Sequence, residues 1–337
     1  MVDLIYRETA LRGDARAESV LRRFPKASVV ECERYGEVFN PKAQNFRLQK
    51  KRPALILARK HRRRVLPAPP GYGVGGAHNY YFSHMLNCVY DCRYCFLQGM
   101  FRSAHYVLFV NFESFQRDMD ELLARHAGGP VWFFSGYDCD SLALDGMSGF
   151  ADAFLPFFAG RPRAFLELRT KSTQVSALLR RTALPNVVTA FSFTPGEISR
   201  ALEHGVPSIA KRIKAIARLQ RNGWPVALRF DPLMDSADFR GSYARLFDAV
   251  FAVVDAGALH SVSLGAFRMP RNFYKNTARL FPDEPLFARA YATAGGVTVY
   301  PPQTERAMVD FCADKILRHV PAQKFFHNTA AADAPGV

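Results

Sequence analysis

The chain has 337 residues, with 45 Lys and Arg residues against 30 Asp and Glu residues, which gives a formal net charge of +15. Hydrophobic residues make up 49 % of the chain and charged residues 22 %, which excludes disordered, collagen-like and coiled-coil proteins. No apolar run approaches the ~20 residues that a membrane-spanning helix needs, and residues 1–19 lack the apolar core of a signal peptide. We therefore expect a cytoplasmic protein without membrane contact.

Residues 1–76 are predicted to form a basic α/β extension, with a helix near residues 16–23 and strands at 28–31 and 54–58. The last of these strands is expected at the surface, because basic residues surround it: Lys50, Lys51 and Arg52 before it, and Arg59, Lys60, Arg62, Arg63 and Arg64 after it. Such a surface would bind phosphates without regard to sequence. The alternative is that these charges are merely solvated.

Residues 77–325 alternate between apolar runs of strand length and helix-length segments, after a Pro/Gly-rich connector at 66–76. The expected strands are 80–86, 107–110, 131–134, 164–168, 187–193, 226–230, 261–266 and 297–300. The expected helices are 112–126, 149–158, 173–181, 208–222, 239–256 and 304–318. This alternation predicts a parallel sheet with helical crossovers, in about six βα units. The Ala-rich end, residues 326–337, is expected to be a flexible tail.

Three of the six cysteines lie within eight residues, Cys88, Cys92 and Cys95, with the spacing C-x3-C-x2-C. Because they follow the first strand of the series, they fall where parallel α/β folds collect their active sites. A reducing cytoplasm argues against disulfides. Three thiolates can bind three irons of a [4Fe–4S] cluster and leave the fourth iron open. The alternatives are a zinc site with His84 as the fourth ligand, or three unrelated buried cysteines.

With Tyr94 just before the third cysteine, the cysteine spacing resembles that of the radical S-adenosylmethionine superfamily. Over most of its length the chain resembles the spore photoproduct lyase family of that superfamily. The similar segments are LIYRETAL near the start, CVYDCRYCFLQG at the cysteines, CDSLALD at 139–145, LELRTKS at 166–172, AFSFTPGEIS at 190–199 and HGVPSIAKRIKAIARLQRNGWPVALRFDPL at 204–233.

The resemblance implies a partial (β/α)6 barrel with a [4Fe–4S] cluster at its mouth, held by the three cysteines. It implies that Lys171 and Ser192 contact S-adenosylmethionine, with Tyr94 beside them. It further implies that a 5′-deoxyadenosyl radical abstracts a hydrogen atom from a methylene-bridged thymine dimer in DNA. The reaction needs a reducing electron donor such as a flavodoxin or ferredoxin. Arg268 and Arg271 are candidate contacts to the DNA backbone.

The sequence departs from the family at two positions. The thiol that donates a hydrogen atom to the product radical aligns with Cys139 in one register and with Tyr137 in the other. The residue after the third cysteine, typically a tyrosine that returns the radical to the cofactor, is Phe96 here, so only Tyr94 is kept. These departures leave two alternatives open: a radical enzyme of this fold acting on RNA, protein or another substrate, and a zinc-stabilised nucleic-acid-binding protein.

Overall fold

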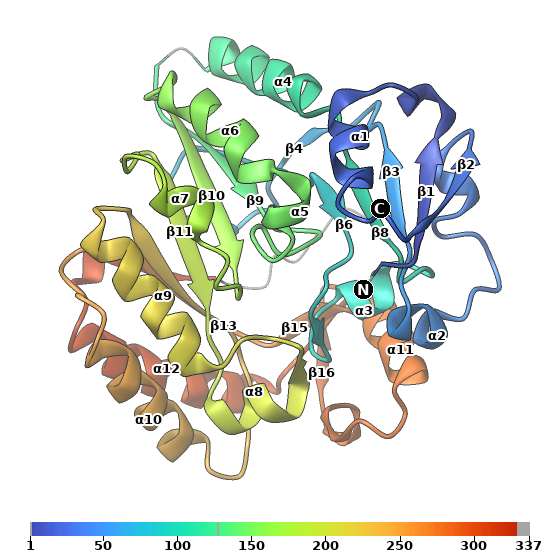
Figure 1. Cartoon of the computed structure of the whole chain (residues 1–337). Coiled ribbons are helices and arrows are strands. Elements are labelled where there is room, and N and C mark those ends of the chain that lie inside the picture. The colour runs from blue at the N-terminus through green and yellow to red at the C-terminus, as the bar shows by residue number, and fades with distance from the viewer. Residues whose placement is uncertain (1, 127, 329–337) are drawn as a thin grey trace.

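The computed structural model describes residues 2–126 and 128–328 (Figure 1). Within them, the larger sheet has eight strands in the order β18-β14-β13-β11-β10-β9-β5-β4. These are β4 (Val65–Pro67), β5 (His78–Phe82), β9 (Val131–Ser135), β10 (Ala164–Thr170), β11 (Val187–Ser192), β13 (Val226–Leu233), β14 (Leu259–Ala266) and β18 (Phe325–His327). Neighbouring strands are parallel except β4 and β5. The series β5 to β14 is the curled half-barrel sheet expected of a partial (β/α)6 barrel.

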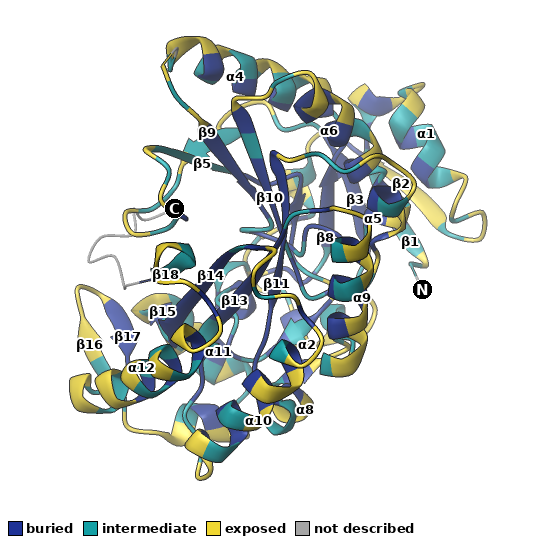
Figure 2. Ribbon diagram, turned by 90° about the vertical axis from the view of Figure 1, so that its left-hand side faces the viewer, coloured by how far each residue is buried: buried dark blue, intermediate teal, exposed yellow. Residues whose placement is uncertain are grey.

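Helices that lie between the barrel strands along the chain cover the outside of the sheet. They are α4 (Phe112–Arg125), α5 (Asp145–Ser148), α6 (Phe150–Ala159), α7 (Ser176–Leu179), α8 (Gly196–Leu202), α9 (Ile209–Arg221), α10 (Phe239–Phe251) and α12 (Pro302–Leu317). The strands are buried whereas the helices alternate between buried and exposed faces (Figure 2). Such a pattern is expected where parallel strands are enclosed on both faces and helices present one apolar stripe.

Helix α9 shows how the sequence specifies these elements locally. The Ser208 side chain accepts a hydrogen bond at the start of the helix, and Gly223 follows its end with φ +76°. Both residues are typical of helix ends, because a hydroxyl satisfies a free N–H and glycine adopts positive φ without strain. Between them Ile213, Ile216 and Leu219 recur at helical spacing and are buried. Their burial holds the helix against the sheet.

A second sheet packs beside the barrel, in the order β2-β1-β3-β8-β6. Its strands are β1 (Leu4–Glu8), β2 (Ser28–Cys32), β3 (Leu55–Ala58), β6 (Met85–Leu86) and β8 (Tyr106–Phe109), and they come from both sides of residue 76. Helices α1 (Ala15–Leu21) and α2 (Phe46–Lys51) belong to the same region.

Two predictions about this second sheet were wrong. The strand expected at the surface, β3, lies between β1 and β8 with its residues fully buried. A central parallel strand is covered on both faces, which explains its uninterrupted apolar run. The segment 107–110, expected in the barrel, forms β8 of this sheet. A short apolar run does not by itself specify which strand it pairs with.

Smaller elements complete the structure. The segment 297–300 was expected in the barrel but forms β17 (Val297–Val299), which pairs antiparallel with β15 (Arg268–Pro270) and β16 (Ala292–Ala294). β7 (Asp91–Cys92) and β12 (Glu203–His204), distant in sequence, pair antiparallel in a separate two-stranded sheet. Helices α3 (Leu97–Met100) and α11 (Arg271–Leu280) lie next to one another. The larger sheet continues to His327, two residues into the expected tail, and residues 329–337 lie outside the described residues.

The Pro/Gly-rich connector packs against the inner face of the half-barrel. Val74 is buried there in a cluster with Trp132, Phe134 and Val188. A Cβ at Gly76 would collide with the Trp132 ring, so this close approach requires glycine. The connector therefore fills the part of the barrel that an open sheet leaves uncovered. In the described residues, no helix is long and apolar enough to cross a membrane.

Candidate active site

A cavity of about 1320 Å³ opens at the carboxyl ends of the barrel strands. Its walls come from residues at or just beyond the carboxyl ends of β5, β9, β10, β11, β13 and β14. All eight residues selected from the sequence line this cavity, namely Tyr94, Tyr137, Cys139, Lys171 and Ser192 together with Cys88, Cys92 and Cys95. Segments up to about 100 residues apart are thus brought to one place by the parallel sheet.

The cysteine loop is held from two sides. On one side, the Lys50 ammonium group donates hydrogen bonds to the carbonyl oxygens of Cys88, at 3.0 Å, and Tyr90, at 3.4 Å. On the other side, Cys92 lies in β7 and pairs with Glu203 of β12. These main-chain contacts fix the loop while leaving the thiols on the cavity wall.

Three thiols make up the donor set of the cysteine loop. Among the residues that the structure describes, no three His, Cys, Asp or Glu side chains are grouped closely enough to share one ion. The fourth ligand of the zinc alternative, His84, is instead buried with its ring stacked on Phe150 at a centroid distance of 3.8 Å. In a [4Fe–4S] cluster each cysteine binds its own iron, so the thiols need not converge on one point. The residues present fit a cluster with one open iron.

Burial also affects how readily these three thiols would lose their protons to bind iron. It raises the pKa of all three thiols, that of Cys88 to about 12. Because metals bind the thiolate, loading must displace three protons from groups that hold them tightly.

A buried carboxylate, Glu203, organises the floor beside the cysteines. It accepts hydrogen bonds from the Tyr94 hydroxyl, from Ser199 Oγ at 2.7 Å and from Arg212 at 2.7 Å. The Arg212 and Glu203 side chains are both fully buried. Arg212 also donates to the carbonyl of Ser192 at 2.8 Å, which connects this ion pair to the end of β11.

The sequence reasoning missed Glu203. Its surroundings in the sequence, LEHG at 202–205, are those of an ordinary solvated turn. Burial alone would raise its pKa, but Lys171 and Arg212 hold the pKa of this carboxyl below its ordinary value. Glu203 therefore remains an anion at neutral pH.

Lys171 extends from the end of β10 into the same group of charges. Its ammonium nitrogen lies 3.9 Å from a Glu203 oxygen and 5.4 Å from the centre of the Tyr94 ring. An ammonium group has three donors, and these contacts leave capacity for a further anionic partner in the cavity. The Tyr94 hydroxyl, in contrast, is already committed to Glu203.

Asp140 fixes the loop after β9. It accepts hydrogen bonds from Thr170 Oγ1 at 2.6 Å and from the Lys171 backbone N–H at 2.6 Å. Gly136 in the same loop has φ +89°, and a Cβ there would lie 2.8 Å from the Arg169 carbonyl oxygen. The loop that carries Cys139 is thus tied directly to the strand end that carries Lys171.

Both candidates for the hydrogen-atom donor face the cavity. Cys139 is 6 % exposed, and burial raises the pKa of its thiol well above the ordinary value. The Tyr137 ring lies 5.5 Å from the Phe96 ring and 4.4 Å from the Tyr81 ring, measured between centroids. The geometry is compatible with either alignment of this loop.

Basic residues line the rim, and their partners separate them into two groups. Arg268 donates two hydrogen bonds of 2.9 Å to Asp231, and Arg64 is paired with Asp118 at 2.6 Å. Three others are exposed on the cavity lining: Arg62, Arg63 and Arg271. Among the described residues, the guanidinium groups of these three have no carboxylate partner, whereas Arg268, also expected to contact the DNA backbone, is paired with Asp231.

Comparison with known proteins identifies a family model and a relative with the same description. The family model described as spore photoproduct lyase matches residues 76–281. Spore photoproduct lyase of Bacillus subtilis (strain 168) is 22 % identical over 177 residues, 52 % of each chain, so the match spans about half the length of that relative.

Solved structures of spore photoproduct lyase match nearly the whole chain. One, complexed with dinucleoside spore photoproduct, gives a TM-score of 0.82 at 16 % identity over 98 % of both chains. A doubly substituted variant with bound AdoMet and dinucleoside spore photoproduct gives 0.83 at 16 % identity over the same share. At this identity, the likeness establishes the fold, a partial barrel with its additional sheet.

Proposed function

Because the chain belongs to the spore photoproduct lyase family, we propose that it is a radical S-adenosylmethionine enzyme that repairs methylene-bridged thymine dimers in DNA. The observation that carries this proposal is the cavity at the strand ends, which is lined by the three cysteines, Lys171, Ser192 and Cys139. The reducing cytoplasm, which keeps such thiols free, is the proposed location.

In this proposal the three cysteines hold a [4Fe–4S] cluster, and Lys171 and Ser192 bind S-adenosylmethionine. When bound and reduced, these groups supply a 5′-deoxyadenosyl radical. Lys171 would pair with the carboxylate of the cofactor through the donor capacity that Glu203 leaves free. Glu203 and Tyr94 act as positioning residues, because they are hydrogen-bonded to each other and the Lys171 ammonium group lies against both of them. The protein thereby contributes orientation and exclusion of water.

Cys139 is the proposed hydrogen-atom donor to the product radical. A donor must keep its S–H bond at working pH, and the raised pKa of this buried thiol ensures that it does. The Tyr137 hydroxyl, whose pKa burial also raises, is the alternative donor. Separate substitution of the two residues distinguishes them.

The size and rim of the cavity fit a damaged dinucleotide. Its volume of about 1320 Å³ exceeds the roughly 300–1,000 Å³ of typical small-molecule pockets, so a cofactor and two extruded bases can share it. A base must leave the duplex to reach such a site, which costs least at a lesion that is already distorted. Arg62, Arg63 and Arg271 would contact the flanking phosphates.

The test is an anaerobic assay of the full chain with its cluster reconstituted. Dithionite, S-adenosylmethionine and an oligonucleotide carrying one spore photoproduct are added, and 5′-deoxyadenosine and restored thymines are measured. We expect lesion-dependent repair, which Cys92→Ala abolishes together with the iron content. Iron binding without cleavage of S-adenosylmethionine would contradict the proposal.

A second candidate function is the same radical chemistry on another substrate, such as RNA or protein. It is favoured by Phe96, which packs against Tyr137 and has no phenolic hydrogen to pass on. In the assay above, cleavage of S-adenosylmethionine with an unchanged lesion would select this candidate. A flavodoxin or ferredoxin is the proposed physiological electron donor for either function.

A further inference from the structure

The cysteine loop reaches the molecular surface at one apolar side chain. Val89, between Cys88 and Tyr90, is 37 % exposed. Lys50 of α2 donates hydrogen bonds to the carbonyl groups on both sides of Val89. The end of α2 and the exposed part of the loop are therefore adjacent, and an apolar side chain beside a cluster ligand is left in contact with solvent.

Helix α2 presents a basic face next to this loop. Phe46 and Lys50, four residues apart, line the cavity, whereas Arg47 and Lys51, also four apart, are exposed outside it. Residues at this spacing lie on one face of a helix. In the described part of the chain neither Arg47 nor Lys51 has an ion-pair partner. We call Arg47, Lys51 and Val89 the α2–loop surface.

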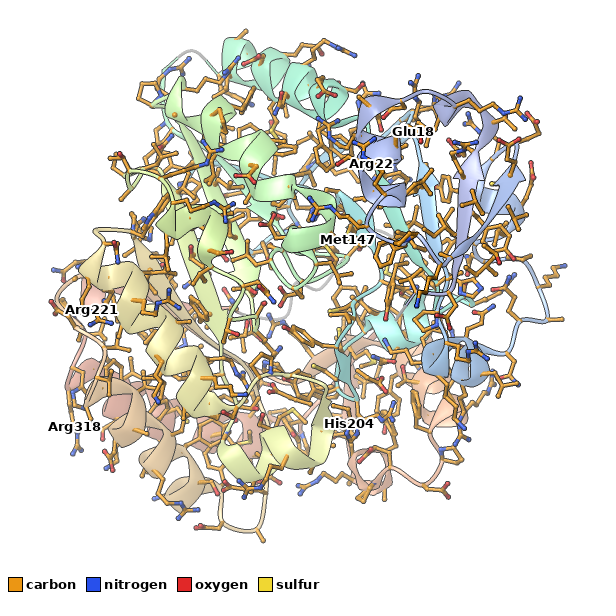
Figure 3. All side chains as sticks on the ribbon, viewed as in Figure 1. Glu18, Arg22, Met147, His204, Arg221 and Arg318 are labelled. Atoms are coloured by element: carbon orange, nitrogen blue, oxygen red, sulfur yellow. The ribbon has the colours of Figure 1, made fainter. Side chains whose placement is uncertain are left out.

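The far side of the cysteine loop is covered by β12. On the far side of the loop, β12 pairs with β7 through Glu203 and Cys92, and the Arg93 backbone N–H donates to the Leu202 carbonyl at 2.8 Å. His204 of β12 is visible at the lower edge of Figure 3. On the cavity side, the proposed cofactor and DNA occupy the access.

We propose that the α2–loop surface is the docking site of a small acidic flavoprotein that delivers electrons to the cluster. This inference rests on the proposed function. The occupant is argued from charge complementarity: two exposed cations of α2, on the helix whose Lys50 contacts the loop at Val89, match an acidic flavoprotein whose apolar flavin edge would meet Val89. In each encounter, the reduced flavin loses one electron and the cluster gains it.

The first experiment measures binding without turnover. Oxidised flavodoxin is titrated into the full chain at low salt, and the affinity of Arg47→Glu/Lys51→Glu is compared with wild type. We expect about a tenfold weaker complex and a smaller salt dependence, because charges at the rim of an interface act mainly on encounter. The matched control is Arg218→Glu/Arg221→Glu, exposed charges on α9; Arg221 lies at the opposite side of the molecule from α2 (Figures 1 and 3). The control should bind like wild type.

The second experiment compares two reductants in the reconstituted enzyme. We expect Arg47→Glu/Lys51→Glu to slow flavodoxin-driven formation of 5′-deoxyadenosine and to leave the dithionite-driven rate unchanged. Equal loss with both reductants, or no loss with either, would overturn the docking site. So would a wild-type enzyme that accepts electrons from dithionite but not from flavodoxin, or a variant that loses DNA affinity while binding flavodoxin normally. A wild-type enzyme inactive with dithionite would instead count against the proposed function, and the binding titration would still test the surface.

Discussion

Removal of the buried carboxylate at Glu203 is expected to destabilise the whole barrel. Glu203→Ala leaves the Arg212 guanidinium fully buried without its carboxylate partner, now 2.7 Å away. It also removes the acceptor for Ser199 Oγ and for the Tyr94 hydroxyl. Breaking a buried ion pair by deleting one partner costs about 3–5 kcal/mol, because the remaining charge is uncompensated. In domains of 150–250 residues, each kcal/mol lost from the free energy of unfolding lowers Tm by about 2–4 °C.

The assay is thermal unfolding of the full chain, with two further variants. Glu197→Ala removes the same residue type from the neighbouring turn of α8, where its partner Arg245 is well exposed. Such surface pairs contribute little, so this variant should melt close to wild type. Glu203→Ala/Arg212→Met removes both charges and should recover part of the lost stability. If Glu203→Ala melts no lower than Glu197→Ala, the Glu203–Arg212 pair does not stabilise the site as argued.

Three other outcomes follow from the structure. Cys139→Ala should cleave S-adenosylmethionine normally but divert the repair product to an adduct; clean thymine products at the wild-type rate, resolved by chromatography, would exclude Cys139 as donor. Arg62→Gln/Arg63→Gln should weaken DNA binding and flatten the slope of log K against log salt by about 1.8, measured by fluorescence anisotropy; an unchanged slope would mean that neither contacts phosphate. Burial lowers the pKa of His84 to about 3, so between that value and about 6.5 only the unfolded chain binds the proton and stability falls as the pH falls. His84→Phe should flatten this part of the Tm–pH curve, and parallel curves for variant and wild type would contradict the reasoning.

Much of the barrel could be predicted from local sequence. Runs such as 131–134, 187–193 and 226–230 are apolar, of strand length and bounded by turn residues, and each forms a parallel barrel strand. The same pattern at 107–110 and 297–300 leads to strands of other sheets. Apolar character requires burial but does not choose the neighbour, because pairing depends on how distant segments fill the space around the run.

The candidate site also has one part that could be predicted from local sequence and one part that could not. The sequence by itself determined the cysteine triplet, because a fixed spacing within one loop is enough to bring three thiols to one wall. Only the tertiary structure decided what surrounds it: Lys50 lies 38 residues from Cys88, and Glu203 lies 109 residues from Tyr94. In sequence these are an ordinary lysine in a basic run and an ordinary glutamate in a turn. They became part of the site when folding buried them, since a charged group excluded from water must find a partner.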